Sequence, residues 1–152
     1  MSILDIKIAF EAKLSEMTPA ISTSYEASSF KPVAGVPYQV VQLIPQTPDN
    51  PVVDGPFYRE QGEFQIFLAY PSNKGTGEAL KRAQAVRDFF KRGTTLTRNG
   101  LSILIYRTPT IAGTQIIGDR VIVPVVVRYT ADVNILKLNI TQTIIFFSVF
   151  IF

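Results

Sequence analysis

The chain of 152 residues is long enough for one domain, and its 47% hydrophobic content, with 11 Phe and 6 Tyr, can build a core without disulfides. It contains no Cys, His or Trp, which excludes Ser-His-Asp and Cys-His catalysis and the usual zinc sites. The net charge of +3 is unevenly spread: residues 1–73 carry four basic and eight acidic side chains, and residues 74–107 carry eight basic and two acidic ones. This asymmetry predicts a basic surface that meets an acidic partner, either nucleic acid or protein, including another copy of the chain.

Two segments have the periodicity of amphipathic helices. The first begins at Ser2 and should end at Thr18-Pro19, and the second spans residues 76–91, capped by Thr76 or Ser72, before Gly93. Their apolar side chains recur three or four residues apart. The expected buried stripes are Ile3, Ile6, Phe10, Leu14 and Met17 in the first, and Ala79, Leu80, Ala83, Val86 and Phe90 in the second.

Four segments have the composition of strands: residues 37–45, 57–70, 101–107 and 120–130, with a further short one around 21–26. Gly62 predicts a bulge or bend in the second. Pro124 predicts an edge or a bulge on one side of the strand at residues 120–130. Apolar side chains on both faces of this strand predict that both faces are covered. The Pro-rich stretch before residues 57–70 makes 46–62 a candidate hairpin arm projecting beyond the sheet.

This order of elements predicts an α+β fold, with one mixed or antiparallel sheet of about four strands and two helices packed on one face. We expect a single domain over residues 1–132, followed by an apolar C-terminal extension over 133–152. The extension would aggregate if it were exposed, so it should pack on its own domain or be received by a neighbouring subunit, unless an altered reading frame produced it. Neither terminus has the pattern of a secretory signal or a membrane-spanning helix, and we expect no membrane partner.

No motif predicts an enzyme, a cofactor or a metal site. The turn at residues 73–77 (NKGTG) lies between a strand and a helix, but it lacks the spacing of a P-loop. Glu60 and Glu63 are three residues apart on a strand, so they point to opposite faces and cannot act on one bond.

The strongest chemical signal is a basic cluster in and after the second helix. It could be an ordinary solvated helix face, or it could dock an acidic partner or lie near DNA phosphates. No aromatic residues alternate with it, so sequence-specific or single-strand binding is not supported. The candidate interface residues are Lys81, Arg82, Arg87, Lys91, Arg92 and Arg98 in this cluster, and Phe57, Tyr58, Arg59 and Glu60 on the arm.

Residues 55–132 also carry a spaced set of motifs. These are GPFYREQGEFQIFLAYP, NKGTGEALKRAQAVRDFFKRGTTL, a strand ending in Arg107-Thr108-Pro109, and VIVPVVVRYTAD. The set resembles a family of phage and prophage minor tail proteins similar to the tail terminator of long-tailed phages. No family pattern matches residues 133–152.

The resemblance implies a structural virion protein that forms a hexameric ring, caps the tail tube, stops its polymerisation and joins it to the head-proximal connector. The implied partners are other copies of the chain, the tube protein, a connector or neck protein, and genomic DNA passing through the lumen. The implied location is the head-proximal end of the tail, after assembly in the host cytoplasm. The alternatives are a neck, head-completion or tube-like subunit and, in another class, a basic nucleic-acid-binding module.

Overall fold

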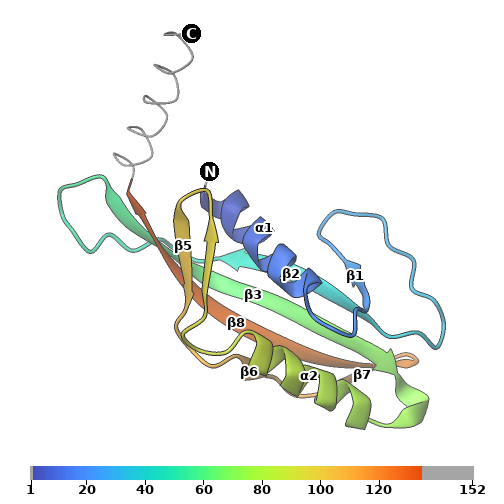
Figure 1. Ribbon diagram of the computed structural model, residues 1–152. Coiled ribbons are helices and arrows are strands. Elements are labelled where there is room, and N and C mark those ends of the chain that lie inside the picture. The colour runs from blue at the N-terminus through green and yellow to red at the C-terminus, as the bar shows by residue number, and fades with distance from the viewer. Residues whose placement is uncertain (1, 135–152) are drawn as a thin grey trace.

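The computed structural model describes residues 2–134, which form one curled sheet with two α-helices on one of its faces (Figure 1). The predicted apolar extension falls outside this part of the chain, apart from its first two residues.

The two helices are α1 (Ser2–Ser15) and α2 (Gly77–Phe89). Most of the predicted stripes are buried, but Ile3 and Leu80 are exposed, at 36% and 42%. Arg82 is buried on α2 instead. Of the two predicted cap residues, Thr76 occupies the N-cap position of α2, but its side chain makes no cap hydrogen bond.

Among the described residues the sheet has eight strands, and the prediction of about four was wrong. Their order is β1-β2-β3-β8-β5-β4, with β6 and β7 also paired to β8. The missed strands β4, β6 and β7 are two to four residues long, too short for side-chain alternation to be recognised in the sequence. The bounds are β1 Ser22–Ser24, β2 Tyr38–Pro45, β3 Phe57–Pro71, β4 Thr95–Arg98, β5 Leu101–Ile105, β6 Thr110–Ile111, β7 Gln115–Ile117 and β8 Arg120–Asn134.

The antiparallel pair of β3 and β8 is the backbone of the sheet. Its register is unbroken from Phe57 opposite Asn134 to Pro71 opposite Arg120, so the bulge predicted at Gly62 is absent. A Cβ atom at Gly62 would lie 2.5 Å from the carbonyl oxygen of Ile44 and 2.7 Å from the hydroxyl of Tyr129. Glycine is therefore required there by close packing between strands.

Pro124 lies between the parts of β8 that pair with β6 and with β7. Its carbonyl accepts a hydrogen bond from the Ala112 amide at 2.9 Å, and its nitrogen faces the same outer side. The strands that pair with this side of β8 are thus short, with gaps between them. A residue without an N–H is tolerated in this gap.

The core lies between the helices and one face of the sheet. Its centre is an aromatic cluster in which the Phe10 ring lies 4.8 Å from Phe64, 6.0 Å from Phe90 and 5.5 Å from Tyr129, measured between ring centroids. The opposite face carries no helix among residues 2–134, and Phe67 and Val126 on it are only half-buried. The prediction that both faces are covered therefore stays a prediction, because no helix within residues 2–134 supplies the second cover.

Candidate assembly interfaces

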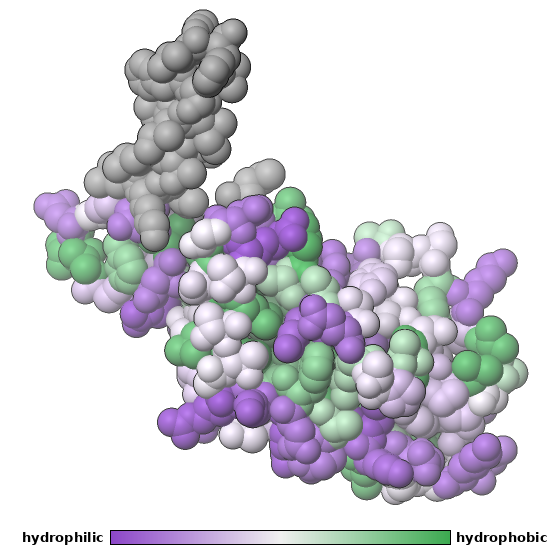
Figure 2. Space-filling view, viewed as in Figure 1, coloured by the Kyte–Doolittle hydropathy of each residue, from purple (hydrophilic) through white to green (hydrophobic). Residues whose placement is uncertain are grey.

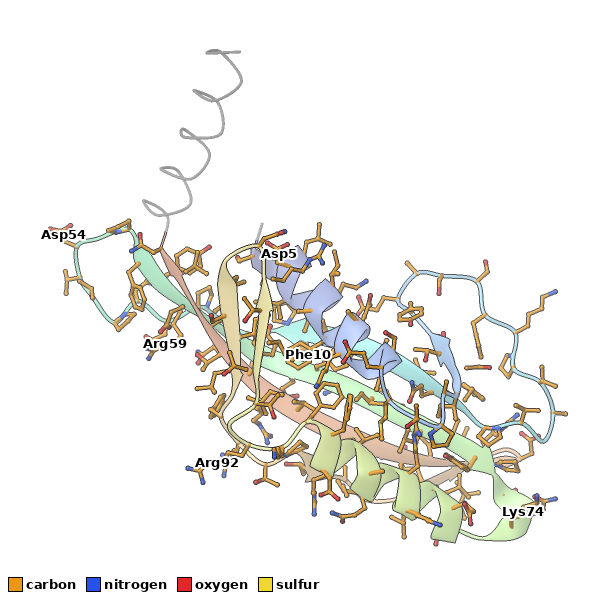
Figure 3. All side chains as sticks on the ribbon, in the orientation of Figure 1. Asp5, Phe10, Asp54, Arg59, Lys74 and Arg92 are labelled. Atoms are coloured by element: carbon orange, nitrogen blue, oxygen red, sulfur yellow. The ribbon has the colours of Figure 1, made fainter. Side chains whose placement is uncertain are left out.

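The predicted basic cluster separates into two groups. Lys81, Lys91 and Arg92 are exposed and form no ion pair within residues 2–134. Figure 2 shows hydrophilic side chains along α2 on this side of the molecule. Figure 3 labels Arg92, which lies beyond the end of α2. These three side chains are available to a partner.

The other three basic residues make contacts within the subunit. Arg82 donates from Nη1 to the carbonyl of Pro19 at 2.6 Å, and Arg87 donates from Nε to the carbonyl of Pro109 at 3.0 Å. Arg98 pairs with Asp5, with 3.5 Å between Nε and Oδ1. Their cationic side chains hold loops and α1 in place, a role that a count of charges along the sequence could not separate from docking.

Arg92 also lines a shallow surface hollow with Tyr106, Arg107 and Thr108. Tyr106 is 43% exposed, and Arg107 is exposed. The hollow therefore combines two cations with one aromatic ring, a combination that the sequence reading did not bring together because the residues come from two separate turns.

The arm was predicted over residues 46–62; in the structure it spans residues 46–61 and extends from one end of the sheet (Figure 1), while Gly62 pairs with Pro45 of β2. The backbone of Arg59 exchanges two hydrogen bonds with that of Asp49, at 2.9 and 2.7 Å, and Gln61 donates from Nε2 to the carbonyl of Thr47 at 2.9 Å. Its tip is exposed, with Val53 fully so and Val52 at 51%.

The four predicted arm residues differ in exposure. Phe57 and Tyr58 are half-buried, and the Tyr58 hydroxyl lies 3.4 Å from that of Ser2. Arg59 pairs with Asp132, with 2.7 Å between Nε and Oδ1, and that hydrogen bond and charge raise the pKa of Arg59. Glu60 is buried on the face of the sheet that carries the helices, whereas Glu63 points to the other face. Burial raises the pKa of Glu60. Their part in an interface stays a prediction.

Arg120 is a structural residue that the sequence reading missed. It is only 7% exposed, it donates from Nη1 and Nη2 to the carbonyls of Val36 and Val33 at 2.6 and 2.7 Å, and it lies over the Tyr38 ring, 5.0 Å from its centroid. This side chain fastens the loop before β2 to the end of β8. A lone arginine at the start of a strand gives no sequence signal for such a role.

A cavity of about 220 Å³ lies beyond the last turn of α1, between β1, β2 and α2; we refer to it as the α1-end cavity. Apolar residues including Leu14, Met17 and Ile21 form part of its wall, and Gln39 and Arg82 line it as well. These two polar residues are 3% and 7% exposed, and burial lowers the pKa of Arg82. The guanidinium still remains charged at neutral pH.

Within residues 2–134 no group of acidic side chains could hold a metal ion, and no helix is long and apolar enough to cross a membrane. The turn at residues 73–77 includes the end of a 3-10 helix (Ser72–Lys74) and is exposed.

The comparison with protein families decides the class of the chain. The model of a family described as phage tail terminator protein matches residues 5–129. The chain belongs to the phage tail terminator family. Family membership gives it a structural role in a phage tail and a place in the tail of the virion, as the resemblance had implied.

A solved structure that carries no functional name has the same fold as this family member. It superimposes with a TM-score of 0.69 at 22% sequence identity, covering 86% of this chain and 96% of its own. At that identity the likeness supports the fold alone. No curated protein matches the chain.

Proposed function

We propose that this protein is a tail terminator that assembles into a closed ring of six copies, with residues 1–132 as its domain. The ring caps the tail tube, stops its polymerisation and joins it to the head-proximal connector or neck protein, while DNA passes through the lumen without sequence-specific contacts. The observation that carries the proposal is the family match over residues 5–129. Contacts with the tube protein and the connector follow from that role.

The shape of the subunit supports a ring. A closed ring of head-to-tail contacts needs two different, complementary surfaces on each subunit. The arm tip, with Asp54, and the turn before α2, with Lys74, lie at opposite ends of the molecule (Figure 3). One subunit can therefore contact two neighbours through unlike ends.

In this mechanism the ring acts by geometry alone. It covers the edge at which the next tube subunit would add, so no catalytic group is needed. The unpaired cations Lys81, Lys91 and Arg92 would face an acidic neighbour or the DNA.

Electron microscopy and native mass spectrometry of the purified full-length chain test the ring. A discrete closed ring that halts growth of the tube protein when added to polymerising tubes is the expected result. Open-ended polymers would indicate a tube-like subunit instead. A stable monomer at high concentration that leaves tube growth unchanged would refute the proposal.

A basic nucleic-acid-binding module is the second candidate, favoured by the hollow that joins Arg92 and Arg107 to Tyr106. It predicts DNA affinity that falls steeply with salt and drops when Lys81, Lys91 and Arg92 are changed to Glu. Arg82 and Arg87 are poor choices for this test because both bond to backbone carbonyls. If the three reversals spoil ring formation while DNA affinity is negligible, the cations serve a protein interface.

A further inference from the structure

Gln39 and Arg82, which line the α1-end cavity, each have one buried polar atom without a hydrogen-bond partner within residues 2–134. Gln39 donates from Nε2 to the Thr23 hydroxyl at 2.8 Å, which leaves its Oε1 acceptor unpaired, and Arg82 uses Nη1 for the Pro19 carbonyl, which leaves Nε unpaired. Buried polar groups are seldom left unpaired in folded proteins. Two such groups lining one cavity indicate a ligand or partner that supplies the missing bonds.

The free atoms specify the chemistry of that partner. Nε and Nη2 lie on one side of a guanidinium and together bind the two oxygens of a carboxylate. The free oxygen of Gln39 requires a donor such as a backbone N–H. An acidic residue within a peptide supplies both, and a neighbouring apolar side chain would suit the wall formed by Leu14, Met17 and Ile21.

Among the described residues, no acidic side chain lines this cavity. Arg82 forms no ion pair within residues 2–134, and the coulombic partner that affects its pKa is Tyr70. The space is also sufficient, since a cavity of about 150 Å³ can hold a benzene molecule and this one measures about 220 Å³.

The arm tip has the matching sequence. Val53 is fully exposed, and Asp54, which follows it, is exposed and forms no ion pair in the described part of the chain. Pro51 and Pro56 stand on either side and restrict the backbone, which lowers the entropy lost on docking. The arm therefore presents an apolar side chain followed by a free carboxylate.

The end of α1 and β1, which line the cavity, lie well along the sheet from the arm (Figure 1), so the arm does not reach the cavity of its own chain. We propose that the arm tip of one copy inserts Val53 and Asp54 into the α1-end cavity of the next, where the Asp54 carboxylate binds Nε and Nη2 of Arg82. The contact is head-to-tail, and it rests on the proposed function because it names the joint between subunits of the ring.

Paired cysteines test this contact directly, because the chain has none of its own. Val53→Cys is combined with Ala20→Cys, since Ala20 is exposed and lines the cavity. After mild oxidation of the assembled full-length protein, non-reducing electrophoresis should show a ladder of covalent multimers that ends at the ring size. The matched control pairs Val53→Cys with Gln84→Cys, which is exposed on α2 but outside the cavity lining, and it should give no ladder.

Asp54→Asn provides an independent measurement that keeps the shape of the arm. Loss of a charge-assisted hydrogen bond should weaken subunit association by about tenfold or more. Asp49→Asn makes the same change in the same arm, away from the tip, and should weaken association by less than about threefold.

The outcomes separate this contact from the ring itself. Rings that form without specific cross-linking at positions 53 and 20 would overturn the contact and leave the proposed function intact. Cross-linking that stops at dimers would show reciprocal exchange and overturn the head-to-tail arrangement. Absence of any oligomer would overturn both. If the thiol introduced at position 20 stays reactive in rings and is protected only by added tube protein, the occupant is that protein, and the contact proposed here is wrong.

Discussion

Gly62→Ala should destabilise the protein by about 2 kcal/mol through a clash that the structure locates. The added methyl would lie 2.5 Å from the Ile44 carbonyl oxygen, 2.7 Å from the Tyr129 hydroxyl and 3.0 Å from the Tyr129 ring. The carbonyl belongs to the backbone of β2, and Tyr129 is fully buried, so neither can move aside freely.

The magnitude follows from two opposing effects. Overfilling a packed core typically costs about 1–3 kcal/mol. Alanine also lowers the entropy of the unfolded chain, which returns roughly 0.4–1 kcal/mol. Contact with a fixed backbone oxygen places the clash in the upper part of its range. At about 2–4 °C per kcal/mol for a chain of this size, the Tm should fall by about 4–8 °C.

The assay is urea unfolding, followed by thermal unfolding, with two control variants. Gly77 is the first residue of α2, and a Cβ atom there would meet no other atom within 4 Å. Gly77→Ala should therefore be neutral or stabilise the protein by up to about 1 kcal/mol. Tyr129→Phe added to Gly62→Ala removes the 2.7 Å contact but keeps the 2.5 Å one, so it should recover only part of the loss. A Gly62→Ala protein as stable as the parent would refute the packing argument.

Three further changes probe the core. Tyr129→Phe alone should stabilise the protein by about 1 kcal/mol in urea unfolding, because the buried hydroxyl has no hydrogen-bond partner within residues 2–134. Burial, and then the charge of Glu60, raises the pKa of Tyr129 to about 12. A loss of stability would reveal a bond to that hydroxyl. Burial raises the pKa of Glu60 above its unfolded value, so folding favours the protonated carboxyl and stability falls as pH rises from about 4.5 through the folded pKa. The stability of Glu60→Gln relative to the parent protein should therefore increase as the pH rises above about 4.5, and a difference that does not change with pH would contradict this sign. Phe10→Ala should cost about 3–5 kcal/mol, measured by urea unfolding, since it empties the centre of the aromatic cluster, and a loss below 1 kcal/mol would show that the cluster is not the centre of the core.

The long elements could be predicted from the sequence because each repeats its pattern several times. Phe64, Ile66 and Leu68 alternate along β3, and the stripe of α1 recurs over four turns. The three strands of two to four residues on the outer side of the sheet give no such repetition. β4 pairs with β5 and β7 with β8 across turns of two residues, and only β6 pairs with a more distant part of β8, so these ladders are local but too short for their pattern to be recognised.

The candidate sites were harder to predict because charge alone does not determine exposure. Arg82 and Arg120 appeared in the sequence as ordinary cations, and both are buried against backbone carbonyls. Leu80, which fitted the apolar stripe of α2, is exposed. Only the packing of distant loops against α2 and β8 distinguishes these cases.

The continuous ladder of β3 and β8 also has a consequence for synthesis of the chain on the ribosome. Even its closest pair, Pro71 and Arg120, is separated by α2 and four short strands, and its farthest pair joins Phe57 to Asn134. Contacts this distant along a chain form slowly, because a long loop must close first. One edge of β3 must therefore stay without its hydrogen-bonding partner until β8 has been translated, and chaperone binding during that interval should determine the yield of soluble subunits.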